Sequence, residues 1–335
     1  MIKELTIHNS LNLLNTEQWK ALLENNSASF FQTTEALHFF DTIGFETFAF
    51  AIEYDTKITA FVSGIIQKEK GIKSHFSRRA IIFGGPILSA DVEEHHITTL
   101  FKTVIKHLKN KVIYIESRNL NDYSHYKETL EKIGFEYHPH LNFQVVCETE
   151  EQVKKKMSSS KLRQVKKSIK EGAEVREANH QSEIEEYYTI LFNLYKTKVK
   201  TPLPALHFFI TLWSQRVAKF LLVFYKNEVI GGIIFPVFQD KVIYEWYVCG
   251  KDGTYKNIYP SILATWSAIQ YACNNNIKRF DFMGAGKPNE NYGVREFKSK
   301  FGGDLVEHGR FIYVANPFLY SLGKKAVKVL KSKKL

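Results

Sequence analysis

An internal repeat constrains this sequence more than any other feature, because two similar halves predict two copies of one folding unit. The first match aligns Tyr54-Asp55-Thr56-Lys57-Ile58 with Tyr225-Lys226-Asn227-Glu228-Val229. The second aligns Lys132-Ile133-Gly134-Phe135 with Lys300-Phe301-Gly302-Gly303. The offsets, 171 and 168 residues, are about half of the 335-residue chain. The sequence therefore predicts a tandem duplication.

Hydrophobic periodicity predicts the same order of elements in both halves: strand, two helices, three strands, helix, strand, helix and strand. The first half predicts strands at 2–7, 47–54, 58–67, 80–83, 112–116 and 135–147, and helices from 16 and at 33–43, 91–108 and 123–133. The second half predicts strands at 174–176, 220–225, 229–238, 242–249, 278–282 and 309–314, and helices at 183–199, 205–217, from 260 and at 293–298. Short turns make 220–249 an antiparallel meander, so we expect an α/β fold with mixed sheets.

The length also favours two domains, at about 150 residues each. We place the first at 1–150 and the second at 151–316, with a basic joining helix at 151–171. The last segment, 317–335, predicts an amphipathic helix that packs back on the first domain or lies on an anionic membrane surface.

The net charge of +11 is concentrated in two elements. Residues 154–170 hold eight basic side chains and no acid, and the terminal helix adds six lysines; without these fourteen the chain is slightly acidic. Within the first element, a basic helix face is formed at spacings 0, 3, 4 and 7 by Arg163, Lys166, Lys167 and Lys170. Such a face suits a pyrophosphate or an RNA backbone, although a merely solvated lysine-rich helix remains the alternative.

Cysteine and histidine spacing does not indicate a metal site. Cys147, Cys249 and Cys273 show no CxxC pattern, so we expect core residues of a reducing compartment. The histidines form no HExxH motif, and adjacent His95 and His96 are expected to point to opposite faces of a helix. No run is long and apolar enough to cross a membrane, and the first residues lack the order of a signal peptide, which predicts a cytoplasmic protein.

One stretch in the second half, 277–303, combines a strand, a glycine-rich loop and a helix that carries lysines. The strand ends near Asp281, the loop contains Gly284 and Gly286, and the helix stops at Gly302-Gly303. This arrangement suits chemistry on an anionic or acyl substrate, but it is equally compatible with a purely structural strand–loop–helix.

The order of elements resembles the GNAT acyltransferase fold, and the tandem pair resembles the FemABX-like family of aminoacyl transferases. The resemblance rests on the segment 161–172 (KLRQVKKSIKEG), the helix after Tyr259-Pro260, the strand 280–282 (FDF), Tyr292-Gly293, and 296–303 (EFKSKFGG). It implies tandem GNAT-like domains that form an amide on an amine of a peptidoglycan precursor, either UDP- or lipid-linked. It also implies an aminoacyl-tRNA donor and no tightly bound cofactor. The GNAT pyrophosphate loop has no counterpart before Pro260, which agrees with a tRNA donor and disfavours acyl-CoA.

The resemblance points to Lys298 as the first catalytic candidate, because it matches the lysine of the family's F-K-x-x-F-G motif. It would neutralise donor phosphate or the tetrahedral oxyanion. Asp281 is the second candidate, as a base, as an orienting carboxylate, or only as a cap of the Gly284 loop. Four further residues are expected to bind substrate: Glu245 and Tyr247 from the third meander strand, and Tyr292 and Arg295 beside the lysine.

Three functions remain open from the sequence. The first is the aminoacyl transferase with tRNA and a cell-wall precursor as partners, acting in the cytoplasm or against the inner membrane face. The second is an acyl-CoA-dependent N-acyltransferase for surface sugars or lipids. The third is a non-catalytic scaffold that binds RNA or anionic lipid through its basic helices.

Overall fold

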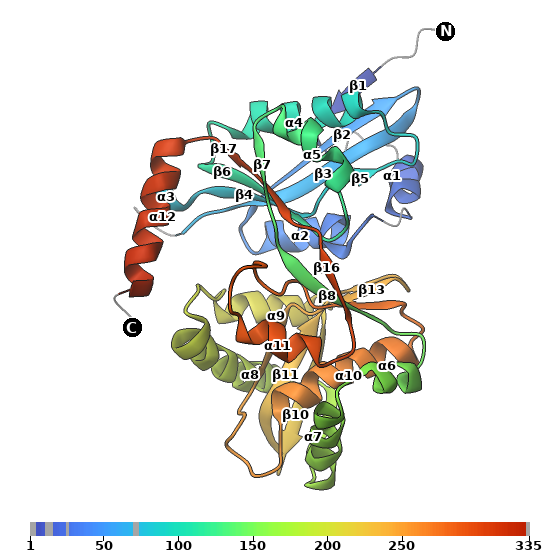
Figure 1. The fold of residues 1–335 in the computed structure, drawn as a ribbon, viewed down its shortest axis with the longest axis vertical. Coiled ribbons are helices and arrows are strands. Elements are labelled where there is room, and N and C mark those ends of the chain that lie inside the picture. Colours follow the sequence, from blue (N-terminus) through green and yellow to red (C-terminus); the bar gives the residue numbers. More distant parts are fainter. Residues whose placement is uncertain (1–4, 11–15, 25–26, 70–73, 333–335) are drawn as a thin grey trace. The chain divides into compact units, whose positions relative to one another are not determined.

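The chain folds as two compact units, drawn in Figure 1 from a computed structural model that describes residues 5–10, 16–24, 27–69 and 74–332. The first unit consists of Met1–Pro139 and His308–Leu335, and the second of His140–Glu307. The last strand and helix of the chain thus belong to the first unit.

A mixed eight-stranded sheet forms the first unit, in the order β1-β2-β3-β4-β6-β17-β7 with β5 beside β3. Strand β3 is buried along nearly its whole length, which requires cover on both faces. Helices α2 and α4 pack on β2, and α1 and α4 pack on β3. The strands are β1 (Leu5–His8), β2 (Glu46–Tyr54), β3 (Lys57–Gln67), β4 (Arg79–Gly84), β5 (Ile87–Leu88), β6 (Tyr114–Asn119), β7 (Phe135–His138) and β17 (Arg310–Val314). The α-helices are α1 (Thr16–Leu23), α2 (Thr34–Thr42), α3 (Ser74–Ser77), α4 (Glu94–Leu108), α5 (Lys127–Glu131) and α12 (Pro317–Ser332).

The second unit contains two smaller sheets, ordered β14-β11-β10-β9 and β12-β13-β15-β8-β16. Helices α8 and α10 both pack on β11 and β14. The strands are β8 (Leu141–Val146), β9 (Glu174–Glu177), β10 (Lys219–Tyr225), β11 (Glu228–Phe235), β12 (Val237–Phe238), β13 (Val242–Tyr244), β14 (Tyr247–Gly250), β15 (Arg279–Asp281) and β16 (Asp304–Glu307). The helices are α6 (Glu150–Lys156), α7 (Ser159–Lys170), α8 (Gln181–Leu194), the π-helical turn Tyr195–Val199, α9 (Leu206–Ser214), α10 (Pro260–Asn274) and α11 (Gly293–Ser299).

The backbone repeats at the two places where the sequence repeats. The β2–β3 turn has φ of 51° at Asp55 and 66° at Thr56, and the β10–β11 turn has φ of 51° at Lys226 and 64° at Asn227. Such paired positive values are typical of a two-residue hairpin that matches the strand twist. The same turn chemistry thus closes the first hairpin of each copy.

Two strands belong to a different unit than the predicted domain boundaries at 150 and 316 imply: β8 lies in the second unit and β17 in the first. The predicted strand 135–147 breaks at Pro139, which has no N–H to donate, and gives β7 to the first unit and β8 to the second. Strand β17 inserts between β6 and β7 of the first unit. Helix α12 follows it there, with the Tyr320 ring edge-on to Tyr114 at 5.2 Å.

The predicted third meander strand, 242–249, is not one strand. Its first part, β13, pairs parallel with β15, and its second part, β14, pairs antiparallel with β11. Glu245 and Trp246 lie at the break between them. This split separates the two sheets of the second unit and places Glu245 at the point where the chain passes from one sheet to the other.

Candidate active site

The break between β13 and β14 brings Glu245 next to Lys298, which the sequence separates by 53 residues. The Glu245 main-chain N–H donates to the Asp281 carbonyl at 2.9 Å, so the backbone still follows β15 at this point. The Glu245 side chain then turns toward α11, and its Oε1 lies 3.1 Å from Lys298 Nζ. Both side chains are nearly buried, 3% exposed for Glu245 and 11% for Lys298.

The ammonium of Lys298 has a complete set of acceptors. It donates to the Phe282 carbonyl at 2.7 Å and to the Gly284 carbonyl at 2.9 Å, and Glu245 is its third partner. Because a lysine ammonium has three N–H donors, this geometry engages all of them. Lys298 therefore suits electrostatic stabilisation of a developing oxyanion better than nucleophilic attack.

Glu245 is the less satisfied member of the pair. Its Oε2 is buried and has no hydrogen-bond partner in the described part of the chain. Burial raises the pKa of Glu245 and outweighs the opposing effects of Lys298 and the Thr265 hydroxyl, while the nearby Asp281 carboxylate raises this pKa further. A carboxylate with a raised pKa, one oxygen of which has no partner among the described residues, is suited to accept a proton.

Asp281, by contrast, is fully enclosed and fully hydrogen-bonded. Its carboxylate accepts from Asn142 at 2.8 Å, from Gln144 at 2.9 Å and from the Met283 N–H at 2.7 Å. The Asn142 side-chain oxygen in turn accepts from the Gly284 N–H at 2.7 Å. These contacts match the predicted alternative in which Asp281 caps the Gly284 loop, and they hold the two carbonyls that Lys298 uses.

Arg295 and Tyr292 lie at the outer side of the same loop. The Arg295 guanidinium donates to the carbonyls of Ala285 at 2.9 Å and Pro288 at 3.2 Å, and also to the Lys287 carbonyl. Arg295 thus shapes the loop by donating to its main-chain oxygens. Tyr292 is 41% exposed and accessible to a ligand.

Tyr247 belongs to an aromatic group beyond the break. Its ring lies 5.0 Å from Phe209 and 6.3 Å from Tyr195, measured between centroids. Burial raises the pKa of the Tyr247 hydroxyl. The side chain is therefore part of the packing of α8, α9 and β14.

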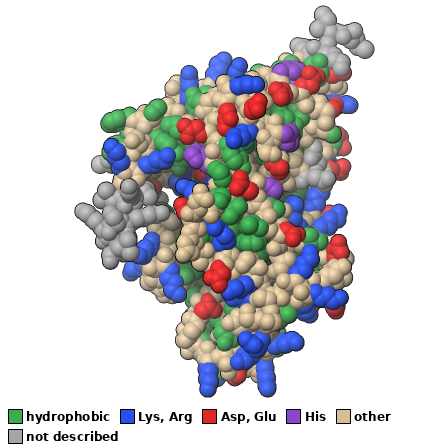
Figure 2. Space-filling view, in the orientation of Figure 1, with side chains coloured by type: hydrophobic (Ala, Val, Ile, Leu, Met, Phe, Trp, Pro, Cys, Tyr) green, Lys and Arg blue, Asp and Glu red, His purple; other side chains and the backbone are tan. Residues whose placement is uncertain are grey.

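The four predicted basic residues of α7 do lie together. They are exposed and, with Ser159 and Leu162, line one hollow of about 450 Å³ on the helix surface. Lys167 Nζ also reaches the Asn257 side chain at 3.5 Å. Figure 2 shows Lys and Arg side chains gathered at the lower end of the view, where Figure 1 draws α7.

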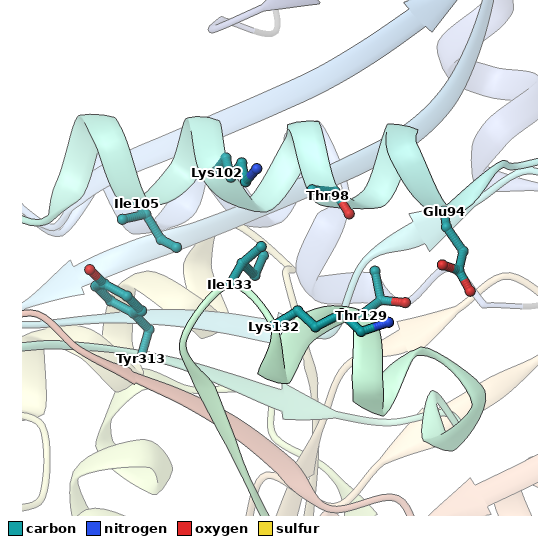
Figure 3. Close-up of a pocket in the computed structure, with 8 residues that line it drawn as sticks. All are labelled: Glu94, Thr98, Lys102, Ile105, Thr129, Lys132, Ile133 and Tyr313. Atoms are coloured by element: carbon teal, nitrogen blue, oxygen red, sulfur yellow. The ribbon is translucent and has the colours of Figure 1, made fainter.

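The first unit carries a second hollow, of about 400 Å³, that contains none of the predicted site residues (Figure 3). Thr98, Lys102 and Ile105 of α4 face Lys132 and Ile133 across it. No titratable pair within it resembles that of Glu245 and Lys298 among the described residues.

The sequence spacing does not indicate a metal site, but three residues at the start of α4 lie close enough together to offer ligands to one ion. His95 is exposed and His96 is buried, as expected for adjacent helix positions, yet their ring centroids are only 4.1 Å apart. Together with Glu93 they offer three ligand atoms within 4.8 Å of one another. The sequence reasoning thus missed that the two histidines approach each other at the helix end.

Two residues that hold the site together were not predicted, Asn142 and Gln144. They alternate with apolar residues on β8, a strand otherwise made of Leu141, Phe143, Val145 and Val146. Polar amides at every second position of a buried strand are the signal that would have indicated a shared polar partner.

Comparison with solved structures defines the class of fold. The structure of FemX matches with a TM-score of 0.72 at 12% identity, over 94% of this chain and 99% of that one. A tandem GNAT protein from the clavulanic acid biosynthesis pathway matches with a TM-score of 0.56 at 7% identity, over 94% and 99%. L-PGS from Bacillus licheniformis matches with a TM-score of 0.53 at 12% identity, over 92% and 96%. The predicted mixed α/β fold of tandem GNAT-like units is confirmed.

These comparisons define a tandem GNAT-like fold. Residues 216–328 match the model of the FemAB family, a segment that contains Glu245, Asp281 and Lys298. Over these residues the chain is similar to the FemAB family, as the sequence motifs predicted. No curated protein matches the chain in sequence. In the described part of the chain, no helix is long and apolar enough to cross a membrane.

Proposed function

We propose that the protein transfers an aminoacyl group from aminoacyl-tRNA to an amine of a peptidoglycan precursor, in the manner of interpeptide-bridge formation. The observation that carries this proposal is the buried Glu245–Lys298 pair, which lies inside the segment that matches the FemAB family. The acceptor is a UDP- or lipid-linked precursor, and the reaction takes place in the cytoplasm or at the inner membrane face.

In the proposed step, the amine nitrogen of the acceptor attacks the ester carbonyl carbon of the donor. The carbonyl oxygen gains negative charge, which the fixed Lys298 ammonium stabilises. Glu245 accepts the proton that the amine loses. The carbon–oxygen bond to the tRNA ribose then breaks, and Glu245 returns the proton to the leaving hydroxyl. Asp281 and Arg295 position the loop whose carbonyls hold Lys298.

Two features favour a tRNA donor over acyl-CoA. The basic face of α7 offers four exposed cations for a phosphate backbone. At the start of α10, the Ser261 N–H already donates to the Asp252 carboxylate at 3.2 Å, and Pro260 has no N–H. A pyrophosphate at that helix end would compete with an acid for its donors.

The test is a transfer assay with purified protein. Aminoacyl-tRNA and acetyl-CoA are supplied in separate reactions with UDP-linked precursor peptide, and the mass of the acceptor is followed. We expect an added aminoacyl residue only with the tRNA donor. Acetylation without aminoacylation would support the acyl-CoA alternative, and no product with either donor, together with intact RNA binding, would support the non-catalytic scaffold.

A further inference from the structure

Lys161, in the first turn of α7, is a buried lysine without an acidic partner. The residue is 9% exposed, and its Nζ lies 4.5 Å from the centroid of Phe297 and 5.9 Å from that of Phe301. The described part of the chain places no carboxylate within ion-pair distance of this ammonium, unlike that of Lys298. A mostly buried lysine whose ammonium lies beside two aromatic rings, with no carboxylate at ion-pair distance, is suited to an anionic ligand.

The surroundings of Lys161 contain one positive charge more than they can neutralise. Burial lowers the pKa of Lys161 and Lys300 lowers it further, while Asp252 and Glu296 oppose this change. Lys300 is already paired with Glu296 at 2.7 Å. Asp252 interacts electrostatically with both Lys161 and Lys198. Three cations and two carboxylates therefore leave a net charge of about +1.

The amino end of α10 adds a further positive field at this place. Gly250 lets the helix start close to β14, since a Cβ there would lie 2.6 Å from the Ser261 nitrogen. Helix α7 is tied to the same helix start, because the Ser168 hydroxyl accepts from the Tyr259 N–H at 2.9 Å. The fifteen-residue α10 directs its dipole toward Asp252, which occupies the Ser261 donor.

We propose that Lys161, with Asp252 as its neighbour, forms a subsite for a single phosphodiester of the nucleic-acid donor. A phosphodiester carries one negative charge and neutralises the excess, whereas a pyrophosphate adds a second charge that Asp252 repels. The subsite thus deepens the proposed function, on which it rests, by naming a residue that anchors the donor and one that selects against CoA.

The experiment measures binding of a labelled RNA hairpin that copies the acceptor stem of tRNA, by fluorescence anisotropy at several NaCl concentrations. We expect Lys161→Met to weaken binding about tenfold, as for loss of a charged hydrogen bond. The slope of log K against log salt should become less negative by about 0.7, the value for one single-strand phosphate. Lys155→Met, on the exposed face of α6, is the matched control and should change neither quantity.

A second variant tests the selectivity without touching the buried lysine. Asp252→Asn keeps a side-chain oxygen for the Ser261 N–H but removes the charge. We expect it to bind the RNA more tightly and to acquire binding of CoA, measured by competition. If wild-type protein binds the RNA while Lys161→Met shows the same affinity and slope, or Asp252→Asn gains nothing, the subsite is wrong and the tRNA donor stands. If wild-type protein does not bind the RNA, the proposed donor and the subsite both fail.

Discussion

A buried glutamate in each unit, Glu116 in the first and Glu245 in the second, pairs with cations, and the two pairs differ in how completely they are satisfied. In the first unit, Glu116 on β6 accepts from Arg310 at 2.6 Å and from Arg118 at 3.0 Å. In the second, Glu245 has Lys298 at 3.1 Å from one oxygen, and its other oxygen makes no hydrogen bond to the described residues. Both glutamates lie at the parallel strand pair of their unit, β4 with β6 and β13 with β15.

The two environments shift the carboxylate pKa in opposite directions. Burial acts to raise the pKa of Glu116, but the two arginines outweigh it and lower that pKa to about 2. Burial raises the pKa of Glu245, and the single lysine does not compensate. A doubly paired carboxylate stabilises its fold, whereas an under-paired one retains the capacity to take up a proton. We infer that the Glu116 pair serves the fold, whereas the Glu245–Lys298 pair retains a capacity for chemistry.

The largest effect is expected for Lys298→Met, which removes the charge but keeps most of the apolar stem. Loss of one preorganised oxyanion stabiliser lowers kcat by about 10³-fold. The measurement is single-turnover transfer to the precursor peptide. Arg118→Met, which removes a cation from the pair in the first unit, is the control and should leave kcat within a few-fold of wild type. Transfer by Lys298→Met within tenfold of wild type would exclude the electrostatic role of this lysine.

Glu245→Gln is expected to lower kcat by about 10²-fold, since the amide keeps the shape but cannot accept the proton. The pH profile of the reaction sharpens this prediction. A base with a raised pKa loses activity as the pH falls through that pKa, which lies above the ordinary glutamate value of about 4.3. The residual activity of Glu245→Gln should lack this acid limb, and Glu116→Gln should retain it. If Glu245→Gln loses activity at low pH as the wild type does, the group that accepts the proton from the amine is not Glu245.

For Glu116→Gln the expected effect is on stability rather than on catalysis. The shift from 4.5 to about 2 corresponds to roughly 3 kcal/mol of unfolding free energy at pH 7. Because the folded pKa is the lower one, this contribution is complete above the unfolded pKa and is lost as the pH falls toward 2. Urea unfolding should therefore show a difference from wild type that shrinks with acidification below about pH 4.5. A difference that stays constant across this range would mean that the ion pairs are not its cause.

The sequence predicts the local features of both units but not which strands pair. The hairpin turns at Asp55-Thr56 and Lys226-Asn227 and the helix ends at Gly134 and Gly302 depend on neighbouring residues, and periodicity finds them. The placement of β17 between β6 and β7 depends on contacts that are distant along the chain. No local pattern distinguishes that arrangement from pairing within the second half.

The same distinction applies to the candidate site. Lys298 is recognisable because a short motif surrounds it. Its pairing with Glu245 follows from the break between β13 and β14, and the alternating pattern of 242–249 predicts a continuous strand instead. The role of Asp281 depends on Asn142 and Gln144 from β8, a strand that the predicted domain boundary assigned to the other half. The sequence shows which residue types are present, but it does not show which partners they contact in the fold, and those partners determine their chemistry.

The smallest expected effect is on RNA affinity, and it compares the removal of one exposed lysine from the basic surface of each unit. Lys166→Ala removes one exposed cation from the α7 face, and we expect RNA affinity to fall about two- to five-fold, as for a solvent-exposed ion pair. Lys132→Ala removes an exposed cation from the hollow of the first unit and should leave affinity unchanged. Both are measured by anisotropy at low and at high salt, and the effect of Lys166→Ala should diminish as salt rises, because exposed charges are screened. Equal losses in the two variants would mean that RNA binding is not confined to the second unit, and the functional contrast between the copies would then be limited to their buried glutamates.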